Sequence, residues 1–274
     1  MKIKSYAKIN LNLKILNEID GGLHKIESLI IPIDLYDLVE INEIDGEHDI
    51  IKFDDESIGT NNTITHSLDL LRKFNNFPQK FEINVQKNIP TEAGLGGGSS
   101  NAGAIISILS KKYNISIPTF RDVALKVGSD VPFFVNGRPS IVTGIGDKVN
   151  PESIDYELDM ILAVPNEVVS TRESFGKFDN LEDNEISIYN FKDIKIFNDF
   201  WKASSLIQPK LIRKKEYLES VTQDMFFMSG SGSALFCLGV KKDLVKKIDL
   251  IDKNEFRLVK LVKKLDFSLE TISD

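Results

Sequence analysis

Glycines and serines gather in residues 90–102, which read PTEAGLGGGSSNA. Glycine has no Cβ atom, so its backbone N–H group can approach a ligand closely. Serine is a favourable N-cap for a helix that begins at this point. A helix N-terminus has unpaired N–H groups and partial positive charge, which together bind anions. The segment therefore predicts a loop that holds phosphate groups.

Other glycine motifs fit this segment less well. The Gly-Lys-Ser/Thr end of a Walker loop is missing, and Ser99 stands where the dinucleotide fingerprint has its third glycine. That fingerprint also expects an acidic residue about twenty positions later, and residues 114–118 contain none. A flexible turn is the remaining alternative, but a turn rarely needs so many glycines before an apolar helix.

The elements around the glycines must hold them in place. Phe81, Ile83 and Val85 alternate as in a strand. Apolar residues from Ala102 to Leu109 recur at helical spacing. The glycines therefore connect a predicted strand to the start of a predicted helix.

Composition sets limits on the class of protein. A chain of 274 residues with 42% hydrophobic residues can form two globular domains or one large one. No apolar run is as long as a membrane-spanning helix, and residues 1–6 lack the layout of a signal peptide, so we expect a cytoplasmic protein. The net charge of −7 disfavours non-specific binding to nucleic acid.

The histidine and cysteine residues do not favour a zinc site or a disulfide. The three histidines, His24, His48 and His66, show no metal-ligand spacing, which disfavours a zinc site. Cys237 is the only cysteine, so no intrachain disulfide can form. Its apolar neighbours predict a buried strand residue.

The first half of the chain alternates predicted strands and helices. Residues 3–15 have a strict period of two and predict one strand, residues 29–44 are rich in β-formers, and residues 45–61 predict a loop. Helices are predicted at 64–73 and at 119–127, the second with capping-box spacing between Thr119 and Asp122 and with Gly128 after its last turn. Asp130 would then lie in a short loop. Asn136 and Gly137 predict a hairpin between residues 133–135 and 140–143.

A change in composition at residues 144–156 predicts a domain boundary near residue 150, with domains at 1–150 and 151–274. The second half opens with a predicted strand at 160–164, and an irregular polar stretch follows at 179–195. Helices are predicted at 197–207 and 210–219. Residues 226–240 predict strand, glycine turn and strand.

Four segments together resemble the three motif regions of the GHMP kinase superfamily. They are AKINL at 7–11, the loop at 90–100, GSDVPFF at 128–134 and SGSGSA at 229–234. Within the superfamily, their spelling and Gly22-Leu23-His24 are similar to the branch that phosphorylates 4-diphosphocytidyl-2-C-methyl-D-erythritol on the route to isoprenoid precursors. The resemblance implies an α+β fold, with an N-terminal ribosomal-S5-like α/β domain and a C-terminal ferredoxin-like domain. It also implies ATP and Mg²⁺ as cofactors.

The same resemblance implies that Lys8 and Asp130 are catalytic. A positioned carboxylate can accept the proton of the 2-hydroxyl nucleophile, and a nearby cation can stabilise charge on the transferring phosphoryl group. Taken alone, Lys8 could be one exposed lysine among many. Asp130 alone could be a turn residue bonded to its own backbone.

The resemblance assigns further residues to the ligands. Residues expected to wrap the ATP phosphates are Pro90, Thr91, Glu92, Ala93, Gly94, Leu95, Gly96, Gly97, Gly98, Ser99 and Ser100. Residues expected to bind the cytidine diphosphate-linked substrate are Asn10, His24, Thr171 and Phe175. Either Ser99 or Ser100 could direct a hydroxyl toward Mg²⁺. Gly230 and Gly232 would close over the phosphates or the substrate, unless they only form a tight hairpin.

Three departures from the family pattern bear on these roles. Leu23 replaces a tyrosine that stacks on cytosine, which could weaken binding by about 1 kcal/mol. Thr91-Glu92 replaces a Met-Gly pair, which puts a carboxylate beside a phosphate loop unless Glu92 points to solvent or pairs with a lysine, and we expect it to point outward. Asn198-Asp199 matches a family pair, whereas Phe200-Trp201 replaces the usual Leu-Glu.

Two other functions fit the sequence less well. A sibling GHMP kinase of the homoserine or mevalonate type would be favoured if Leu23 marks a changed pocket. A non-catalytic nucleotide-binding relative would have no need of Lys8, Asp130 and the whole glycine loop together.

Overall fold

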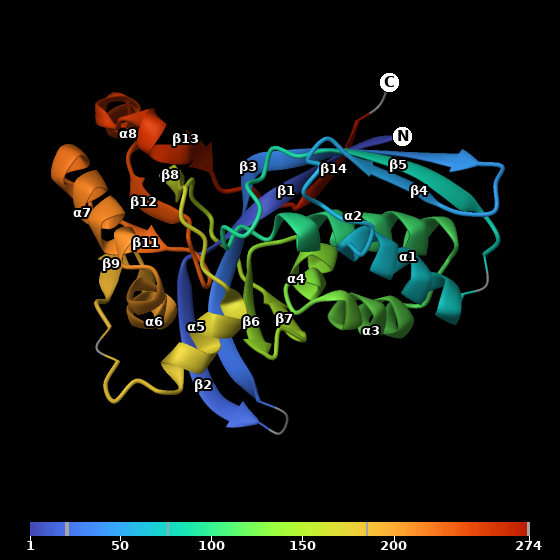
Figure 1. The fold of residues 1–274 in the computed structure, drawn as a ribbon, viewed down its shortest axis with the longest axis horizontal. Helices are drawn as coiled ribbons and strands as arrows, with labels where there is room; N and C mark the ends of the chain where they lie inside the picture. Colours follow the sequence, from blue (N-terminus) through green and yellow to red (C-terminus); the bar gives the residue numbers. More distant parts are fainter. Residues whose placement is uncertain (20–21, 76, 185, 273–274) are drawn as a thin grey trace.

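A computed structural model describes residues 1–19, 22–75, 77–184 and 186–272, which form two β-sheets with helices packed against them (Figure 1). The larger sheet contains β1 (Lys2–Asn10), β2 (Asn12–Ile19), β3 (Leu23–Ile44), β4 (Ile50–Phe53), β5 (Lys80–Gln86), β6 (Ser140–Gly144), β7 (Lys148–Pro151), β9 (Tyr189–Phe191), β10 (Ile194–Asn198) and β14 (Leu269–Ile272). The smaller sheet contains β8 (Asp159–Pro165), β11 (Phe227–Met228), β12 (Leu235–Gly239) and β13 (Phe256–Lys263).

The described helices are α1 (Thr63–Phe74), α2 (Gly97–Lys112), α3 (Ile117–Val127), α4 (Val131–Asn136), α5 (Thr171–Phe178), α6 (Phe200–Ile207), α7 (Lys210–Thr222) and α8 (Lys241–Lys247). Short 3₁₀ turns follow at Ile248–Leu250 and Lys253–Glu255. The expected α+β fold is therefore confirmed. Among the helices of the described residues, none combines the length and apolar character needed to span a bilayer.

The long strand β3 organises the larger sheet, because it pairs with β1, β2, β5 and β6. The predicted alternation at 3–15 is present, but the prediction of one strand is wrong, since the chain leaves the strand at Leu11 and divides into β1 and β2. Alternation reports which face a side chain occupies and not where pairing stops. Lys8 lies opposite Pro32, which has no N–H group to donate to the ladder.

Helices α1 to α4 cover one face of the larger sheet (Figure 1). Apolar side chains of α1, α2 and α3 form one core with those of β3 and β5. The predicted helices at 64–73 and after the glycines are confirmed as α1 and α2. The expected serine N-cap is wrong, because Gly96 is the N-cap residue and both serines lie in the first turn of α2.

Two local predictions between α2 and β6 are wrong. Helix α3 begins at Ile117 after Ser116, two residues before the predicted capping box, although Gly128 does follow its last turn. The expected strand at 133–135 is helix α4, which ends at Gly137 in the left-handed conformation with φ 76°. Asn136-Gly137 thus ends a helix and does not form a hairpin. The sequence signal is ambiguous, because the end of a helix and a hairpin turn both need a residue with positive φ. Asp130 comes immediately before α4.

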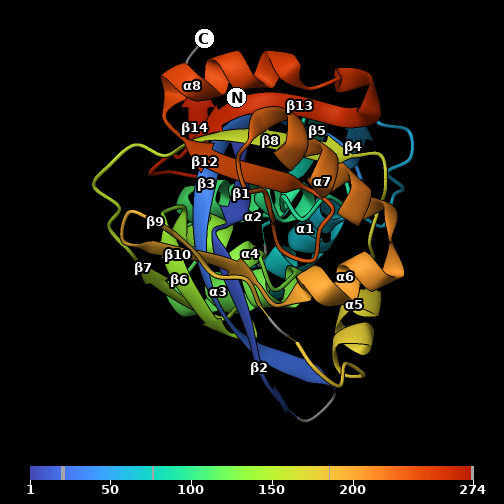
Figure 2. The ribbon, with the colours of Figure 1, turned by 90° about the vertical axis from the view of Figure 1, so that its left-hand side faces the viewer.

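In the second half, helix α7 lies beside the smaller sheet, α6 lies next to α5, and α8 lies on the outer side of β13 (Figure 2). The predicted strands at 160–164 and 226–240 and the helix at 210–219 are confirmed. The irregular stretch at 179–195 contains β9 and the start of β10, and the predicted helix at 197–207 begins only at Phe200. The predicted loop at 45–61 contains β4. Cys237 is buried in β12, as expected.

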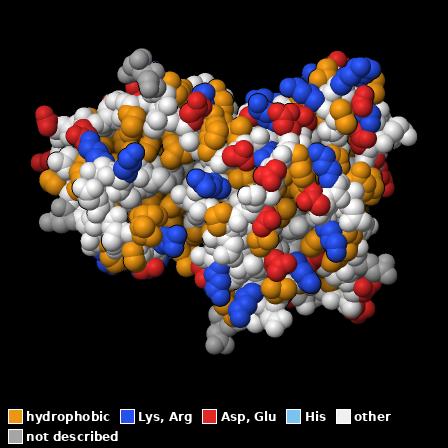
Figure 3. Space-filling view, turned by 180° about the vertical axis from the view of Figure 1, so that it is seen from behind, with side chains coloured by type: hydrophobic (Ala, Val, Ile, Leu, Met, Phe, Trp, Pro, Cys, Tyr) orange, Lys and Arg blue, Asp and Glu red, His pale blue; other side chains and the backbone are white. Residues whose placement is uncertain are grey.

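Strands from both ends of the chain join the larger sheet. β14 pairs antiparallel with β1, and β10 pairs parallel with β2. The division at residue 150 stays a prediction. Acidic and basic side chains are interspersed on the face opposite to that of Figure 1 (Figure 3).

Candidate active site

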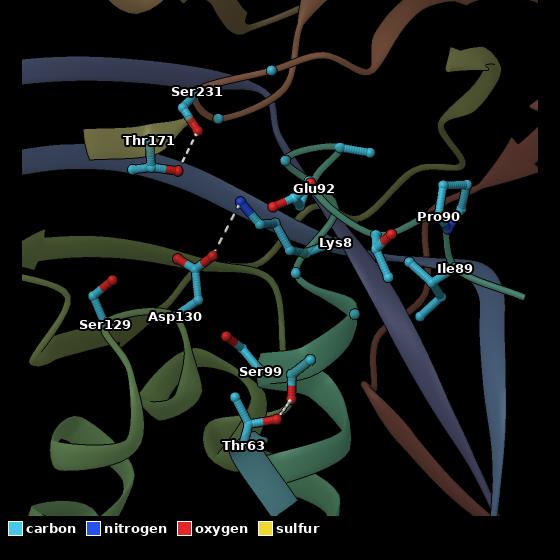
Figure 4. Close-up of a pocket in the computed structure, with 18 of the residues that line it drawn as sticks. Lys8, Thr63, Ile89, Pro90, Glu92, Ser99, Ser129, Asp130, Thr171 and Ser231 are labelled. Carbon is cyan, nitrogen blue, oxygen red and sulfur yellow. Dashed lines mark hydrogen bonds and ion pairs between the residues drawn. The ribbon is translucent and has the colours of Figure 1, made fainter. Parts of the chain in front are cut away.

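A cavity of about 800 Å³ opens between β1, the glycine loop, helix α5 and residues 229–232 (Figure 4). Of the loop residues expected at ATP, Leu95 and Ser100 do not line this cavity and the other nine do. Lys8, Asn10, Asp130, Thr171 and Phe175 also line it. The structure thus brings together segments that the sequence places far apart.

The cavity has two ends of different character. One end is bounded by Phe53, Ile58 and residues 61–63 before and at the start of α1, which the sequence analysis did not single out. The other end is bounded by Leu13, Ile26 and side chains of α5 and α6. Helices α1 and α5 lie far apart, α1 at the right and α5 at the lower left of Figure 1. A ligand at each end would therefore meet the other near Lys8.

Lys8 and Asp130 point toward each other across the middle of the cavity (Figure 4). The Nζ atom of Lys8 is 3.4 Å from Oδ2 of Asp130, and the two side chains are 4% and 34% exposed. The backbone N–H of Lys8 donates to the carbonyl of Leu95 at 3.0 Å, which ties β1 to the glycine loop. Lys8 is therefore a buried side chain of the cavity and not one surface lysine among many.

Asn10 sets the position of the lysine ammonium. Its Oδ1 atom accepts a hydrogen bond from Nζ of Lys8, and its Nδ2 donates to Oγ of Ser28 at 2.8 Å. The Ser28 hydroxyl donates in turn to the carbonyl of Asn12 at 2.5 Å. Ser28 therefore fixes which end of the Asn10 amide faces Lys8. The predicted substrate residue Asn10 lines the cavity, but both ends of its amide are bonded within the protein.

The glycine loop packs too tightly for side chains at two positions. Gly94 has φ 74°, and a Cβ atom there would lie 2.2 Å from the carbonyl oxygen of Ser229. Gly96 has φ 70°, and a Cβ atom there would lie 2.8 Å from the ring of Phe134 on α4. Glycine is needed at both positions because an L side chain fits neither the conformation nor the space.

The two serines after the glycines have different surroundings. The Ser100 hydroxyl donates to the carbonyl of Tyr6 at 2.6 Å and lies 2.6 Å from the hydroxyl of Ser5, so it is used inside the protein. Ser99 lines the cavity. Thr63 at the start of α1 donates its hydroxyl to the carbonyl of Gly98 at 2.8 Å and holds the end of the loop. Of the two serines, Ser99 is the one placed to reach a ligand.

A buried carboxylate supports the start of the glycine loop. Oδ1 of Asp37 accepts from the N–H groups of Asn88 and Ile89, both at 2.8 Å. Oδ2 accepts from Nδ2 of Asn101 at 3.0 Å and from Nζ of Lys87. The sequence analysis missed Asp37. The available signal was an acidic residue at an inward position of an apolar strand, on the same face as Leu35 and Val39.

The loop at 229–232 joins the two halves of the site. The Ser229 hydroxyl accepts from the N–H of Asn10 at 3.1 Å and donates to the carbonyl of Gly94 at 3.1 Å. Gly230, Ser231 and Gly232 line the cavity. The second glycine element is therefore part of the cavity wall and more than a tight hairpin.

Known proteins resemble this chain in sequence and in fold. Residues 62–138 match the family "GHMP kinases N terminal domain". A 4-diphosphocytidyl-2-C-methyl-D-erythritol kinase from Clostridioides difficile (strain 630) is 30% identical over 92% of this chain and 92% of its own length. The enzyme of the same name from Prochlorococcus marinus (strain MIT 9301) is 34% identical over 89% of this chain and 86% of its own length. The chain belongs to the 4-diphosphocytidyl-2-C-methyl-D-erythritol kinase family.

Solved structures agree on the fold of this kinase. A crystal structure of 4-(cytidine 5'-diphospho)-2C-methyl-D-erythritol kinase matches with a TM-score of 0.77 and 22% identity, over 96% of this chain and 98% of the other. A homoserine kinase from Cytophaga hutchinsonii matches with a TM-score of 0.65 and 14% identity, over 99% of this chain and 97% of the other. Both comparisons show the GHMP kinase fold.

On the α5 side of the kinase, His24 and Phe175 contact each other directly. Their rings stack with centroids 5.0 Å apart and an interplanar angle of 18°. Nε2 of His24 lies 2.7 Å from Oδ1 of Asp179. His24 is buried and is not among the cavity-lining residues, and Leu23 is 52% exposed and also outside the lining. Of the substrate residues expected here, the cavity therefore includes Phe175 and Thr171 but not His24.

Glu92 is an exposed residue of the glycine loop but also lines the cavity, so the expectation that it points outward stays a prediction. Its cationic neighbour is Arg257 of β13 and not a lysine. Burial lowers the pKa of Arg257, and the charges of Glu92 and Glu167 partly oppose this shift. The guanidinium donates to the carbonyl of Thr91 at 3.0 Å and to that of Pro165 at 2.9 Å. Arg257 thus connects the smaller sheet to the glycine loop and offsets the unusual acid beside it.

The described residues contain no cluster of three or more His, Cys, Asp or Glu side chains that could form a complete metal cage. Mg²⁺ in phosphoryl-transfer enzymes is usually held by one or two carboxylates together with the phosphates of the substrate. Asp130 and Ser99 both line the cavity and have oxygen atoms of this kind. The side chains present therefore fit a nucleotide-bound Mg²⁺.

Proposed function

We propose that this kinase transfers the γ-phosphoryl group of ATP to the 2-hydroxyl of 4-diphosphocytidyl-2-C-methyl-D-erythritol. The observation that carries the proposal is the contact between Lys8 and Asp130, with the glycine loop on one side and helix α5 on the other. The choice of acceptor substrate is supported by the two relatives described above, which are both 4-diphosphocytidyl-2-C-methyl-D-erythritol kinases.

In this proposal the glycine loop holds the ATP phosphates. Backbone N–H groups in the first turn of α2 have no partner within the helix and can donate to phosphate oxygens. The base would lie toward Phe53 and residues 58–63, which bound that end of the cavity. Ser99 would direct its hydroxyl toward Mg²⁺, which neutralises phosphate charge when it is bound.

Asp130 would accept the proton of the acceptor hydroxyl as its oxygen bonds to phosphorus and the bond to ADP breaks. The ammonium of Lys8, fixed by Asn10, would stabilise negative charge on the phosphoryl group during transfer. Because Lys8 is buried, water screens this charge less than it would at the surface. Thr171 and Phe175 would contact the acceptor from α5.

The test is ADP release with ATP, Mg²⁺ and 4-diphosphocytidyl-2-C-methyl-D-erythritol, with homoserine and mevalonate as control acceptors. We expect turnover of the cytidyl substrate alone. Asp130→Asn should lower kcat by at least about 10²-fold, the usual range for a lost general base, while circular dichroism shows a folded protein. Turnover of a control alcohol, or an Asp130→Asn variant with unchanged kcat, would contradict the proposal.

A further inference from the structure

Asn198, at the end of β10, forms hydrogen bonds with the loop at 229–232 and with the residue before it. Its Nδ2 atom donates to the carbonyl of Met228 at 2.6 Å and to the carbonyl of Gly230 at 2.8 Å. Its Oδ1 atom accepts from the N–H of Phe200 at 2.8 Å. The side chain is buried and uses both amide hydrogens on this one loop.

Its neighbour Asp199 makes a different contact. Oδ2 of Asp199 accepts from the N–H of Ile15 on β2 at 2.7 Å. Asp199 therefore fastens the end of β10 to the larger sheet, and Asn198 extends from that fixed point to the loop. The two adjacent polar residues have separable tasks, which makes Asp199 a matched control for Asn198.

The carbonyl groups of Ser229, Gly230 and Ser231 accept hydrogen bonds within the protein, whereas two of the loop's N–H groups have no such partner in the described residues. Ser204 of α6 donates its hydroxyl to the carbonyl of Ser231 at 3.0 Å, which adds to the two carbonyls bonded by Asn198. Within the described part of the chain, the N–H groups of Gly230 and Ser231 have no hydrogen-bond partner. Both residues line the cavity, so these donors are available to a ligand with acceptor atoms.

The position of the loop favours the acceptor substrate as that ligand. The Ser231 hydroxyl lies 2.7 Å from the hydroxyl of Thr171 on α5, and a Cβ atom on Gly230 would lie 3.3 Å from Nζ of Lys8. The loop thus borders the α5 end of the cavity and the reacting centre. The ATP phosphates have their own donors at the start of α2. The acceptor has a diphosphate, which needs hydrogen-bond donors of its own.

We propose that Asn198 is a positioning residue for acceptor binding: it fixes the loop at 229–232 so that Gly230 and Ser231 offer backbone N–H groups to the acceptor's diphosphate. This inference rests on the proposed function. It assigns a task to Asn198, which itself lies outside the glycine motifs.

The test compares Asn198→Asp with Asp199→Asn. Asn198→Asp keeps the size of the side chain but replaces the NH₂ group, which supplies both donor hydrogens, by a carboxylate oxygen that faces two carbonyls. Isothermal calorimetry would measure Kd for 4-diphosphocytidyl-2-C-methyl-D-erythritol without ATP and, separately, Kd for a non-hydrolysable ATP analogue. We expect Asn198→Asp to weaken acceptor binding at least about tenfold and to leave the Kd of the ATP analogue within about threefold. Asp199→Asn should leave both constants within about threefold of those of the natural chain.

Asn198→Ser keeps one donor and should give an intermediate loss, which preserves the test if the Asp variant does not fold. Acceptor binding unchanged in a folded Asn198 variant would overturn this inference alone. Equal weakening of both ligands would also overturn it, because the loop would then act on the site as a whole. A natural chain that does not bind the acceptor would overturn the proposed function and this inference with it.

Discussion

The imidazole of His24 lies directly against the ring of Phe175, with centroids 5.0 Å apart and Nε2 held by Asp179 at 2.7 Å. A base stacked between two rings needs them about 7 Å apart, which is twice the contact distance between carbon atoms. The cytosine of the acceptor therefore cannot lie between these two rings as they stand. The side of Phe175 that borders the cavity is the surface left for a base.

Phe175→Leu should raise KM for the acceptor about fivefold, because loss of an aromatic pair costs about 1 kcal/mol. KM for ATP should not change, since Phe175 borders the opposite end of the cavity from α1. Steady-state kinetics with each substrate varied in turn would measure both values. Phe178→Leu is the matched control, because Phe178 is on the same helix and also packs near Phe200 but does not line the cavity. Equal KM values in the Phe175 variant and the natural chain would exclude stacking there.

Asp37→Asn should lower the free energy of unfolding by about 3–5 kcal/mol, because it removes the carboxylate partner of the nearly buried Lys87 ammonium, which then keeps only the amide oxygen of Asn101. That loss is a large part of the total stability expected for a domain. Urea unfolding followed by circular dichroism would measure it. Asp34→Asn on the same strand is the control, since Asp34 is only half-buried and accepts a single backbone N–H, from Lys263 at 2.7 Å. A loss no larger than that of the control would show that Asp37 does not support the loop.

Asp37 also shows where prediction from sequence ends. Alternation in β3 could have placed Asp37 on the inner face, but its partners lie in the segment before α2 and in α2 itself, and they were not predicted. The glycine loop, α2 and the proximity of Lys8 to Asp130 could be predicted because their signals are local or resemble a family motif. The strands β9 and β10 were missed because β10 is stabilised by parallel pairing with β2, far away in the sequence. Asn198 acquires its contacts only through that pairing.

Ser28→Ala should lower kcat about tenfold with little change in either KM. Loss of the hydroxyl leaves Nδ2 of Asn10 without its acceptor, and the amide can then turn its NH₂ group toward the ammonium of Lys8. The matched control is Ser140→Ala in the neighbouring strand β6. Ser140 is also buried, accepts from an asparagine amide at 3.0 Å and donates to a backbone carbonyl at 2.9 Å, but it does not touch Asn10. Similar kcat values in the two variants would show that the orientation of Asn10 does not affect turnover.

Cys237 should be unreactive in the folded kinase. Burial raises the pKa of its thiol to about 12. A solution at pH 8 is about four units below this pKa, so the thiol is almost wholly protonated. The thiolate is the reactive form, so a disulfide reagent such as dithionitrobenzoate should label the native chain only through opening of the smaller sheet. Labelling should become rapid and stoichiometric in guanidinium chloride. Rapid labelling of a chain with native circular dichroism would contradict the burial of β12.

The labelling rate also connects β12 to the active site. The loop at 229–232 lies between β11 and β12, so a ligand that contacts the loop stabilises the folded state of the sheet that contains Cys237. A ligand that binds only the native state reduces the open population by the factor 1 + [L]/Kd. Saturating acceptor should therefore slow labelling about tenfold or more, and it should do so less in Asn198→Asp than in Asp199→Asn at the same acceptor concentration. If the acceptor slowed the labelling of Cys237 equally in the two variants, the contacts of Asn198 with the loop would have no effect on how acceptor binding stabilises β12.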